Sequence, residues 1–480
     1  MKIKKILLPT LVLAAILIGI LIKMGNTDLK NETLKITLMG FFSDKIAPEN
    51  ISTIALYHIN NNLWDTLITN EREPSVGKIE KISDDQRTYT FSISEFAIFS
   101  NGRKITSEDV KFSIDRIIAK EENGHANAKG IIDTVKILSP NEIEIKLKTA
   151  TPSFLFLLST PEFAIIPKEI CDEKTLAINS LNITSGAYVV TKINHEKKMV
   201  ELMKNSHFSR HEKNSPRYIE VSFSTDTGEN PESLTKDGNM FFEISNSNAK
   251  KVIKFLKNSS SNFSYAVTKP SLSNFLKKNP KHISSEKARG FSALVKKYFE
   301  FETETEVKSL QFFPPRTFGS LNENELPGLV SNEKIDKITI KVSNPNTPLM
   351  IALKNSEEKM GVKLNIVDMK SPEEADFIGS SQGMNTDFPE VELFLAMVSP
   401  YAFISVQEDM KSKINEAFHE VNAEKRSLLI KKIGIDLLES GTIIPVTVRS
   451  YLHVFNSKAI DASQITTYDG DIPFWKIKML

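Results

Sequence analysis

The chain has 480 residues, of which 40% are hydrophobic, so it is long enough to form two or more domains with buried cores. Its 61 Lys and Arg residues nearly balance its 60 Asp and Glu residues and leave a formal net charge of +1. This balance argues against nucleic acid as a partner unless the basic residues are strongly clustered. Lysines gather between Lys250 and Lys297, where they alternate with apolar residues such as Phe275 and Leu276 at a spacing that indicates a solvated helical face.

The N-terminus carries a segment that targets the chain to a membrane. Lys2, Lys4 and Lys5 precede an uncharged run over residues 6–22, which would span about 25 Å as a helix. This length lies between a signal-peptide core and a full transmembrane helix, and no A-x-A cleavage site follows, so we favour an uncleaved anchor over a cleaved signal peptide. The lysines place the N-terminus in the cytoplasm and the bulk of the chain outside. No cysteine ends the apolar run, which excludes a lipid anchor on such a cysteine.

The first part of the chain predicts two strands, a turn and a capped helix. Residues 33–38 and residues 88–93 both alternate between apolar and polar, as in strands of a half-buried sheet. An Asn-Gly pair at 101–102 is a strong turn signal, because glycine accepts a positive φ. Thr106 can then cap a helix, with Asp109 three residues on to complete a capping box.

Hairpin and βαβ patterns follow further along the chain. Two segments of period two, 135–138 and 143–147, predict a hairpin. In the last third, residues 338–342, a helix through 350–360 and residues 362–366 form a βαβ pattern, and Gly361 ends the helix. We also expect a short apolar helix at 154–158 and longer helices at 285–294 and 414–438. Further strands are expected at 219–223 and 443–446.

The segment from Ser83 to Ile118 resembles the signature of the extracytoplasmic solute-binding proteins of family 5, the oligopeptide and dipeptide class of ABC-transporter binding proteins. In that family a Tyr-Thr-Phe strand is followed by a Gly turn and a Thr/Ala-Glu-Asp-Val helix. The signature positions are occupied here by Gly102, Thr106, Glu108, Asp109, Val110, Ser113 and Arg116. Shorter matches, such as IIPK at 165–168 and SGAY at 185–188, extend the resemblance from about Leu34 to Lys478. These residues mark a fold and carry no chemistry.

The resemblance implies an α/β fold of the type II periplasmic-binding-protein kind. Such a fold has two lobes, an extra subdomain in the first lobe, two crossover segments and a ligand cleft between the lobes. The expected segments are a signal or anchor at 1–26, the main subdomain of lobe 1 at 27–62, 186–268 and 452–480, the extra subdomain at 63–185, and lobe 2 at 269–451.

One segment resembles a ligand-binding stretch of the family. Residues 383–388, with the sequence GMNTDF, stand where peptide-binding relatives have Gly-Trp-x-Ala-Asp-Tyr. In those relatives the aspartate meets the α-ammonium group of the peptide, which implies that Asp387 anchors the ligand. The ligand-binding residues implied by this segment are Asp387, Asn385, Met384 and Phe388. Met384 replaces an aromatic side chain of the relatives, which implies a weaker stacking surface or a different ligand.

Two further candidates follow the first strand, and Asp387 has an alternative role. Phe42 and Ser43 lie where relatives line the cleft, so the resemblance implies that they contact the ligand. Asp387 could instead cap a helix before the apolar run that starts at Val391, because Pro389 suits a first helical turn.

No signature of an enzyme is present: the chain has no G-x-S-x-G, no H-E-x-x-H and no phosphate-binding loop. We therefore expect no catalytic residue, no cofactor and no metal site. His207 and His211 are four residues apart, but two exposed histidines in a polar loop are the better interpretation. Cys171 is the single cysteine, so an intramolecular disulfide is excluded, and we expect a packed thiol rather than a nucleophile.

The resemblance implies a protein that captures a short peptide, or a similar small solute, and delivers it to an ABC permease in the inner membrane. It would be a periplasmic or cell-surface monomer, tethered to the cytoplasmic membrane by its N-terminal segment, and it would have no nucleic-acid partner. Two alternatives stay open: a membrane-tethered sensor or scaffold that no longer serves transport, and a nickel, haem or sugar binder of the same family. A hydrolase of extracytoplasmic peptides is a third alternative, which lacks a catalytic constellation.

Overall fold

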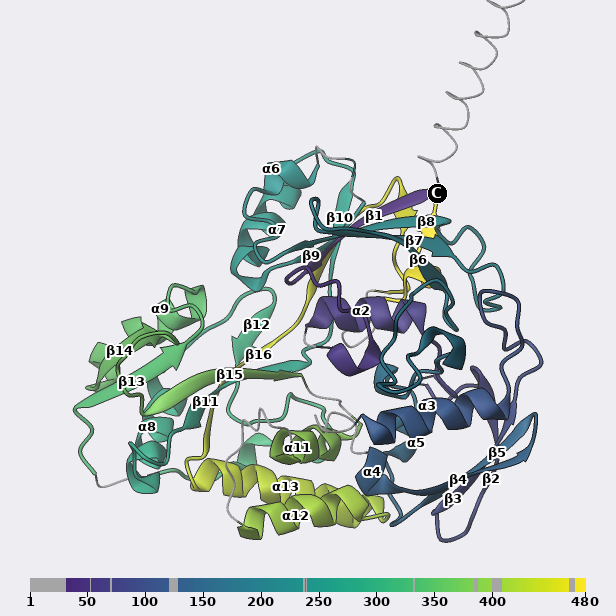
Figure 1. Ribbon diagram of the computed structural model, residues 1–480. Coiled ribbons are helices and arrows are strands. Elements are labelled where there is room, and N and C mark those ends of the chain that lie inside the picture. The colour runs from purple at the N-terminus through teal and green to yellow at the C-terminus, as the bar shows by residue number, and fades with distance from the viewer. Residues whose placement is uncertain are drawn as a thin grey trace, which may run out of the picture.

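The computed structural model describes residues 32–51, 53–69, 71–120, 128–235, 238, 240–330, 333–383, 387–398, 408–465 and 471–480. The segment expected as a signal or anchor, residues 1–26, lies outside these ranges, so its membrane role stays a prediction. Within these ranges, no helix combines the length and the apolar character needed to cross a bilayer. Three larger β-sheets, of seven, six and four strands, form the frame (Figure 1).

Lobe 1 is built on the seven-stranded sheet at the top of Figure 1. Its strands, in spatial order, are β10 (Phe263–Val267), β17 (Leu452–Asn456), β9 (Phe241–Ile244), β1 (Thr33–Met39), β8 (Tyr218–Ser224), β7 (Met199–Lys204) and β6 (Tyr188–Asn194). Strand β1 pairs in parallel with β8 and β9, and the other neighbours are antiparallel. Helix α2 (Ile54–Leu63) packs into the main core of this lobe, whereas α7 (Ala249–Asn258) packs into a second, smaller core. The lobe also holds α6 (Pro231–Leu234) and a small sheet of β18 (Ile460–Asp461) and β19 (Lys478–Met479).

A four-stranded antiparallel sheet forms a separate subdomain at the lower right of Figure 1. Its strands, in spatial order, are β2 (Gly77–Ile82), β3 (Thr88–Ile93), β5 (Glu142–Leu147) and β4 (Ile132–Ser139). Helices α3 (Ser107–Ala119), α4 (Ala128–Ile131) and α5 (Phe154–Leu157) complete the subdomain. The apolar stripe of α3, with Val110 and Ile114, is buried in the same core as the inward face of β3.

Lobe 2 is built on the six-stranded mixed sheet. Its strands, in spatial order, are β12 (Glu306–Lys308), β16 (Ile443–Arg449), β11 (Leu272–Lys278), β15 (Phe377–Gly383), β13 (Lys337–Val342) and β14 (Lys363–Asp368). Its helices are α8 (Ser285–Tyr298), α9 (Pro348–Asn355), α10 (Glu357–Met360), α11 (Pro389–Val398), α12 (Glu408–His419) and α13 (Ala423–Glu439). Figure 1 shows α11, α12 and α13 along the lower edge of the molecule, beside the four-stranded subdomain. One hydrophobic core contains residues of both, so the subdomain and these helices are packed together.

The two lobes are joined by two neighbouring crossover segments. One runs from β10 to β11 through Thr268, and the other from β16 to β17 through Tyr451. The Thr268 amide donates to the Tyr451 carbonyl at 3.0 Å, and the Tyr451 amide donates to the Thr268 hydroxyl at 2.9 Å. Two short, neighbouring connections of this kind are typical of the hinge region in two-lobed proteins. The architecture confirms the predicted α/β fold of two lobes, and the segment boundaries expected for them stay a prediction.

Several local predictions are confirmed. Strand β3 is buried at every second residue, and residues 132–139 and 142–147 pair as the expected hairpin. The capping box of Thr106 and Asp109 is present at the start of α3. Gly361 ends α10 with a φ of 65°, the left-handed conformation that favours glycine after a helix.

Three local expectations are wrong. Phe275 and Leu276 do not belong to a helical face, because they lie on strand β11, where the sheet pairing of residues 272–278 on both sides overrides the local spacing. The helix expected over 414–438 is two helices, α12 and α13, and the second starts at an N-cap in which the Asn422 side chain accepts from the Lys425 amide. His211 is half-buried rather than exposed, because its ring packs edge-on against aromatic neighbours.

Candidate ligand-binding cleft

A cavity of about 740 Å³ lies between the two lobes. Lobe 1 lines it with Met39, residues 245–247 and one face of α7. Lobe 2 lines it with parts of β11, β15 and β16, with residues 342–344 and with the first turn of α9. A volume of this size falls in the range of sites that enclose small organic ligands.

The topology explains why these segments meet. Strands β1 and β9 are parallel neighbours, and the chain leaves them at Met39 and Ser245 on the same edge of the sheet. In lobe 2, β13 is parallel to β14 and β15, and residues 343–347 lead from its carboxyl end into α9. Ligands of open α/β sheets bind outside the carboxyl ends of such strands, where loops rather than ladder partners fill the space.

A buried polar network forms part of the cavity wall. Glu306 on β12 is 3% exposed and accepts a hydrogen bond from the Asn274 amide at 2.7 Å. It also accepts from the Thr447 hydroxyl and from the Asn246 side chain. The Ser381 hydroxyl donates to the Asn274 carbonyl oxygen at 2.6 Å. Because Asn246 belongs to lobe 1 and the other residues to lobe 2, the network ties the two lobes together beside the cavity.

A buried ionic cluster lies in lobe 1 behind Met39. The Met39 amide donates to Glu243 at 2.9 Å, and His58 lies between Glu243 and Asp471, with nitrogen to oxygen distances of 3.8 and 3.9 Å. Burial lowers the pKa of His58, but the two carboxylates outweigh burial and raise it to about 9. Burial alone would raise the pKa of Glu243, yet the contacts with His58 hold it below its usual range. The neighbouring His453 is buried and has its pKa lowered to about 4 by burial, so this ring is neutral.

Neither polar cluster was found from the sequence. Glu306, Asn274 and Thr447 lie on three strands that are far apart in the sequence, and His58 and Glu243 are similarly separated. A single buried acid inside an apolar strand, as Glu243 in FFEI, is the one local signal that could have indicated a buried charge.

The candidates at the end of β15 lie in two environments. Met384 and Asn385 fall outside the described residues. Asp387 is exposed, and Phe388 is buried directly before α11, which starts at Pro389. Phe388 stacks on Phe156 of α5 at 5.8 Å between ring centroids. Phe388 therefore joins the four-stranded subdomain to lobe 2, and the ligand roles of all four residues stay a prediction.

Helix α11 continues with a buried carboxylate, Glu390, and a half-buried one, Glu392. Glu390 is fully buried, with its Oε1 3.4 Å from the Arg426 Nε, and burial raises the pKa of Glu390 to about 7. Glu392 accepts from the Gln382 side chain at 2.8 Å, and burial raises its pKa to about 7 as well. Carboxyl groups that titrate near neutrality follow directly after the predicted anchor.

The candidates after β1 lie on the surface of lobe 1. The Phe42 ring packs edge-on against Phe223 and His195, at 5.6 and 5.9 Å. The Ser43 hydroxyl accepts from the Lys45 amide at 3.2 Å. Neither Phe42 nor Ser43 is among the residues found to line the 740 Å³ cavity, so their ligand contact also stays a prediction.

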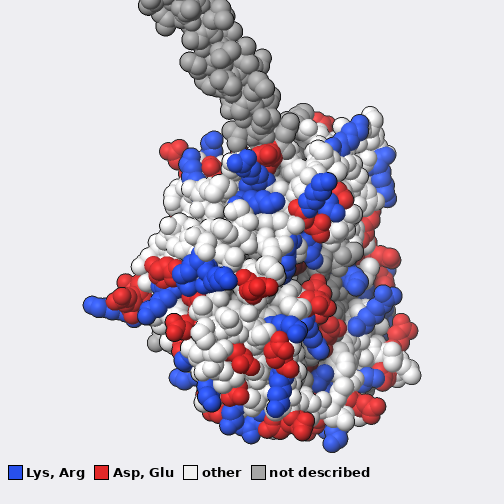
Figure 2. Space-filling view, turned by 90° about the vertical axis from the view of Figure 1, so that its right-hand side faces the viewer, with Lys and Arg blue, Asp and Glu red and all other residues white. Residues whose placement is uncertain are grey.

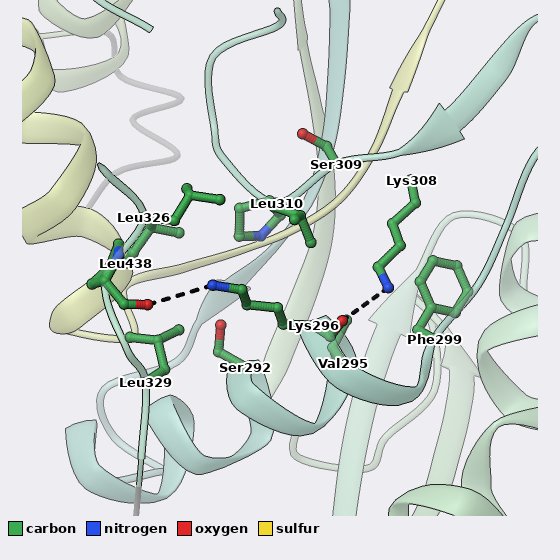
Figure 3. A pocket seen from close by; sticks show the side chains of 12 residues that line it. Ser292, Val295, Lys296, Phe299, Lys308, Ser309, Leu310, Leu326, Leu329 and Leu438 are labelled. Atoms are coloured by element: carbon green, nitrogen blue, oxygen red, sulfur yellow. Dashed lines mark hydrogen bonds between the residues drawn. The ribbon is translucent and has the colours of Figure 1, made fainter. Parts of the chain in front are cut away.

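A second recess lies in lobe 2 beside α8 (Figure 3). It encloses about 10 Å³, because the side chains of Lys296 and Lys308 lie across it. The Lys308 Nζ donates to the Lys296 carbonyl at 2.8 Å, and the Lys296 Nζ donates to the Pro327 carbonyl at 3.5 Å. This volume holds about one water molecule, so the recess is no ligand site.

Two further titratable candidates, Cys171 and His211, pack against the core of lobe 1 or its aromatic neighbours. Cys171 packs against the core of lobe 1, where burial raises the pKa of its thiol. The pKa of His211 is lowered to about 4, mainly by burial, and its Nε2 lies 2.9 Å from the Asn205 carbonyl oxygen. Among the residues that the structure describes, no group of three or more His, Cys, Asp or Glu could hold a metal ion.

Comparisons with known proteins agree with the sequence resemblance. Residues 71–290 match the model of the bacterial extracellular solute-binding proteins, family 5 Middle. The chain is 25% identical over 173 residues to the dipeptide-binding protein DppE of Bacillus subtilis, a match that covers 32% of each chain. The chain thus matches about a third of the length of this curated relative. The predicted resemblance to family 5 is confirmed.

Solved structures agree over nearly the whole length. NikZ from Campylobacter jejuni, in complex with Ni(L-His), has a TM-score of 0.76 and 18% identity, and the match covers 93% of this chain and 99% of NikZ. DppA from Helicobacter pylori, in complex with the peptide STSA, has a TM-score of 0.76 and 16% identity over 94% of this chain and 99% of DppA. At these identities the similarity establishes the two-lobed fold.

Proposed function

We propose that this chain, a solute-binding protein of family 5, captures a small extracytoplasmic solute between its two lobes and delivers it to an ABC permease. The observation that carries the proposal is the cavity of about 740 Å³ lined by residues of both lobes. A short peptide is the preferred solute, because a similar structure holds the peptide STSA and a curated relative binds dipeptides. The protein then binds and releases its ligand, and no bond is made or broken.

The hinge supports this mechanism. The crossover segments at Thr268 and Tyr451 are hydrogen-bonded to each other. The two segments would therefore move together when one lobe rotates against the other. Closure around a ligand would exclude water, and each hydrogen bond or ion pair with the ligand then gains strength. Backbone groups at the strand ends can bind the main chain of a peptide, which gives affinity with little selectivity for side chains.

Asp387 is the proposed anchor for the peptide's α-ammonium group. It is exposed and follows β15, whose residues Gly379, Ser380 and Ser381 line the cavity. The bound end of the ligand is proposed to lie between two groups of residues. One group is Asn385, Met384 and Phe388, and the other is Phe42 and Ser43.

The segment at residues 6–22 is proposed to hold the protein at the outer face of the cytoplasmic membrane. An uncleaved anchor also favours a second candidate function, a tethered sensor or scaffold that binds solute but serves no transport. Uptake of the bound solute by cells with and without the gene separates the two, because a sensor would leave uptake unchanged.

Calorimetry tests the proposal directly. The purified full-length chain would be titrated with pools of dipeptides to hexapeptides, with a nickel–histidine complex as a second titrant. We expect heat and a rise in Tm with one or more peptide pools, and a loss of binding in Asp387→Asn. Binding of the nickel complex alone would contradict the peptide proposal, and the absence of any binding would refute solute capture of either kind.

A further inference from the structure

The cavity between the lobes has a basic lining. Lys250, Lys251 and Lys254 line it from α7, and Arg449 lines it from the end of β16. Lys250 and Lys254 are four residues apart on one helix, so they lie on the same face, one turn apart. We call the three lysines the lysine wall. All three are exposed, and the Lys251 Nζ donates to the Glu229 carbonyl of lobe 1.

One carboxylate lies beside them, against four cationic side chains. Glu306 also lines the cavity, but it is buried and accepts hydrogen bonds from Asn274, Thr447 and Asn246. Residues 301 and 303 line the cavity, whereas the exposed acids at 302 and 304 alternate with them and are not among the lining residues. In the part of the chain that the structure describes, neither the lysine wall nor Arg449 forms an ion pair with a carboxylate.

The basic character is a property of the cavity and not of the surface in general. Figure 2 shows a face of the molecule on which Lys and Arg are interspersed with Asp and Glu. The whole chain has a formal net charge of +1. The described lining residues, in contrast, include four cationic side chains and one carboxylate.

The opposite wall adds to the positive potential. Thr347 and Pro348 line the cavity at the start of α9, and the Thr347 hydroxyl accepts from the Met350 amide. The N-terminus of a helix carries a partial positive charge. Both lobes thus present positive charge to the same space, and closure brings like charges together unless an anion lies between them.

We infer that the cleft selects ligands that present carboxylates to the lysine wall. The inference rests on the proposed function, in which the solute is a short peptide, and it names acidic peptides as the preferred class. A carboxylate between α7 and the start of α9 offsets the repulsion between the lobes, so ligand charge and closure are coupled. Binding should weaken as the salt concentration is raised. Salt screens the attraction between the ligand carboxylates and the lysine wall while the cleft is still open to solvent.

Three tripeptide pools of equal length test the inference: one rich in Asp and Glu, one rich in Ala and Ser, and one rich in Lys and Arg. Each pool is titrated into the full-length chain at low and at high salt. The same titrations are made with the double variant Lys250→Gln/Lys254→Gln and with Lys257→Gln. Lys257 is a matched control, because it is an exposed lysine on α7 that does not line the cavity.

We expect the acidic pool to bind tightest and to lose affinity at high salt. The double variant should bind the acidic pool at least about tenfold more weakly, because it loses the hydrogen bonds between Lys250, Lys254 and the ligand carboxylates. Its affinity for the neutral pool should not change. Lys257→Gln should match the wild type. Equal binding of all pools, or an unchanged double variant with a wild-type Tm, would overturn the inference and leave peptide binding intact. Binding of no pool to the wild type would overturn both.

Discussion

Protonated His58 stabilises the folded chain, and this stabilisation is lost as the pH rises above neutrality. Its imidazole is 1% exposed and lies between Glu243 and Asp471. These carboxylates raise the pKa of His58 from 6.5 to about 9 against the opposing effect of burial. The folded state therefore binds the proton more tightly than the unfolded chain does.

The size of the effect follows from the pKa. A rise from 6.5 to about 9 corresponds to about 3 kcal/mol, at about 1.4 kcal/mol for each pH unit. This stabilisation is fully present below pH 6.5, falls as the pH rises towards 9, and is lost above it. In His58→Gln the buried Glu243 has no cation beside it at any pH, so the variant lacks this contribution throughout.

Urea unfolding at pH 6 and pH 9.5 measures the difference. Trp64 and Trp475 both pack in the core of lobe 1 with His58, so tryptophan fluorescence reports on the lobe concerned. We expect His58→Gln to be less stable than the wild type at pH 6, and the gap to narrow by about 3 kcal/mol at pH 9.5. His195→Gln is the control, because the His195 side chain is 66% exposed. A gap of the same size at both pH values would refute the ionic role of His58.

Three further predictions concern packing. A Cβ at Gly186 would lie 2.6 Å from the backbone at the end of α2, so Gly186→Ala should cost about 1–3 kcal/mol by thermal unfolding, whereas Gly328→Ala, with open space around it, should cost little. Phe388→Ala removes the contact with Phe156, so we expect a loss of about 3–5 kcal/mol in urea unfolding, and an unchanged midpoint would show that Phe388 does not hold the subdomain. Burial raises the pKa of Cys171, so alkylation by iodoacetamide at pH 7.5 should be slow in the folded chain and fast in urea, and equal rates would contradict it.

The sequence predicted an element correctly where all of its signals lie within one continuous segment. The unit from strand β3 to helix α3 was found because its alternation, its turn and its capping box all lie within one continuous segment. The βαβ pattern of residues 338–366 was also found, but its helix through 350–360 is two helices, α9 and α10, that meet at Ser356. Phe275 and Leu276 were misassigned because a central strand with partners on both sides can carry a helix-like spacing of lysines and apolar residues.

The sequence by itself determined the family resemblance, the two-lobed fold and the segment in which a ligand anchor is expected. Tertiary structure alone decided the charge of the cavity, because its wall combines Met39, the lysine wall, residues 342–350 and Arg449 from distant parts of the chain. The lysines of α7 look like a solvated face in the sequence, and they are solvated. Folding places that face opposite the start of α9, and Coulomb energy depends on this distance through space rather than on separation along the chain.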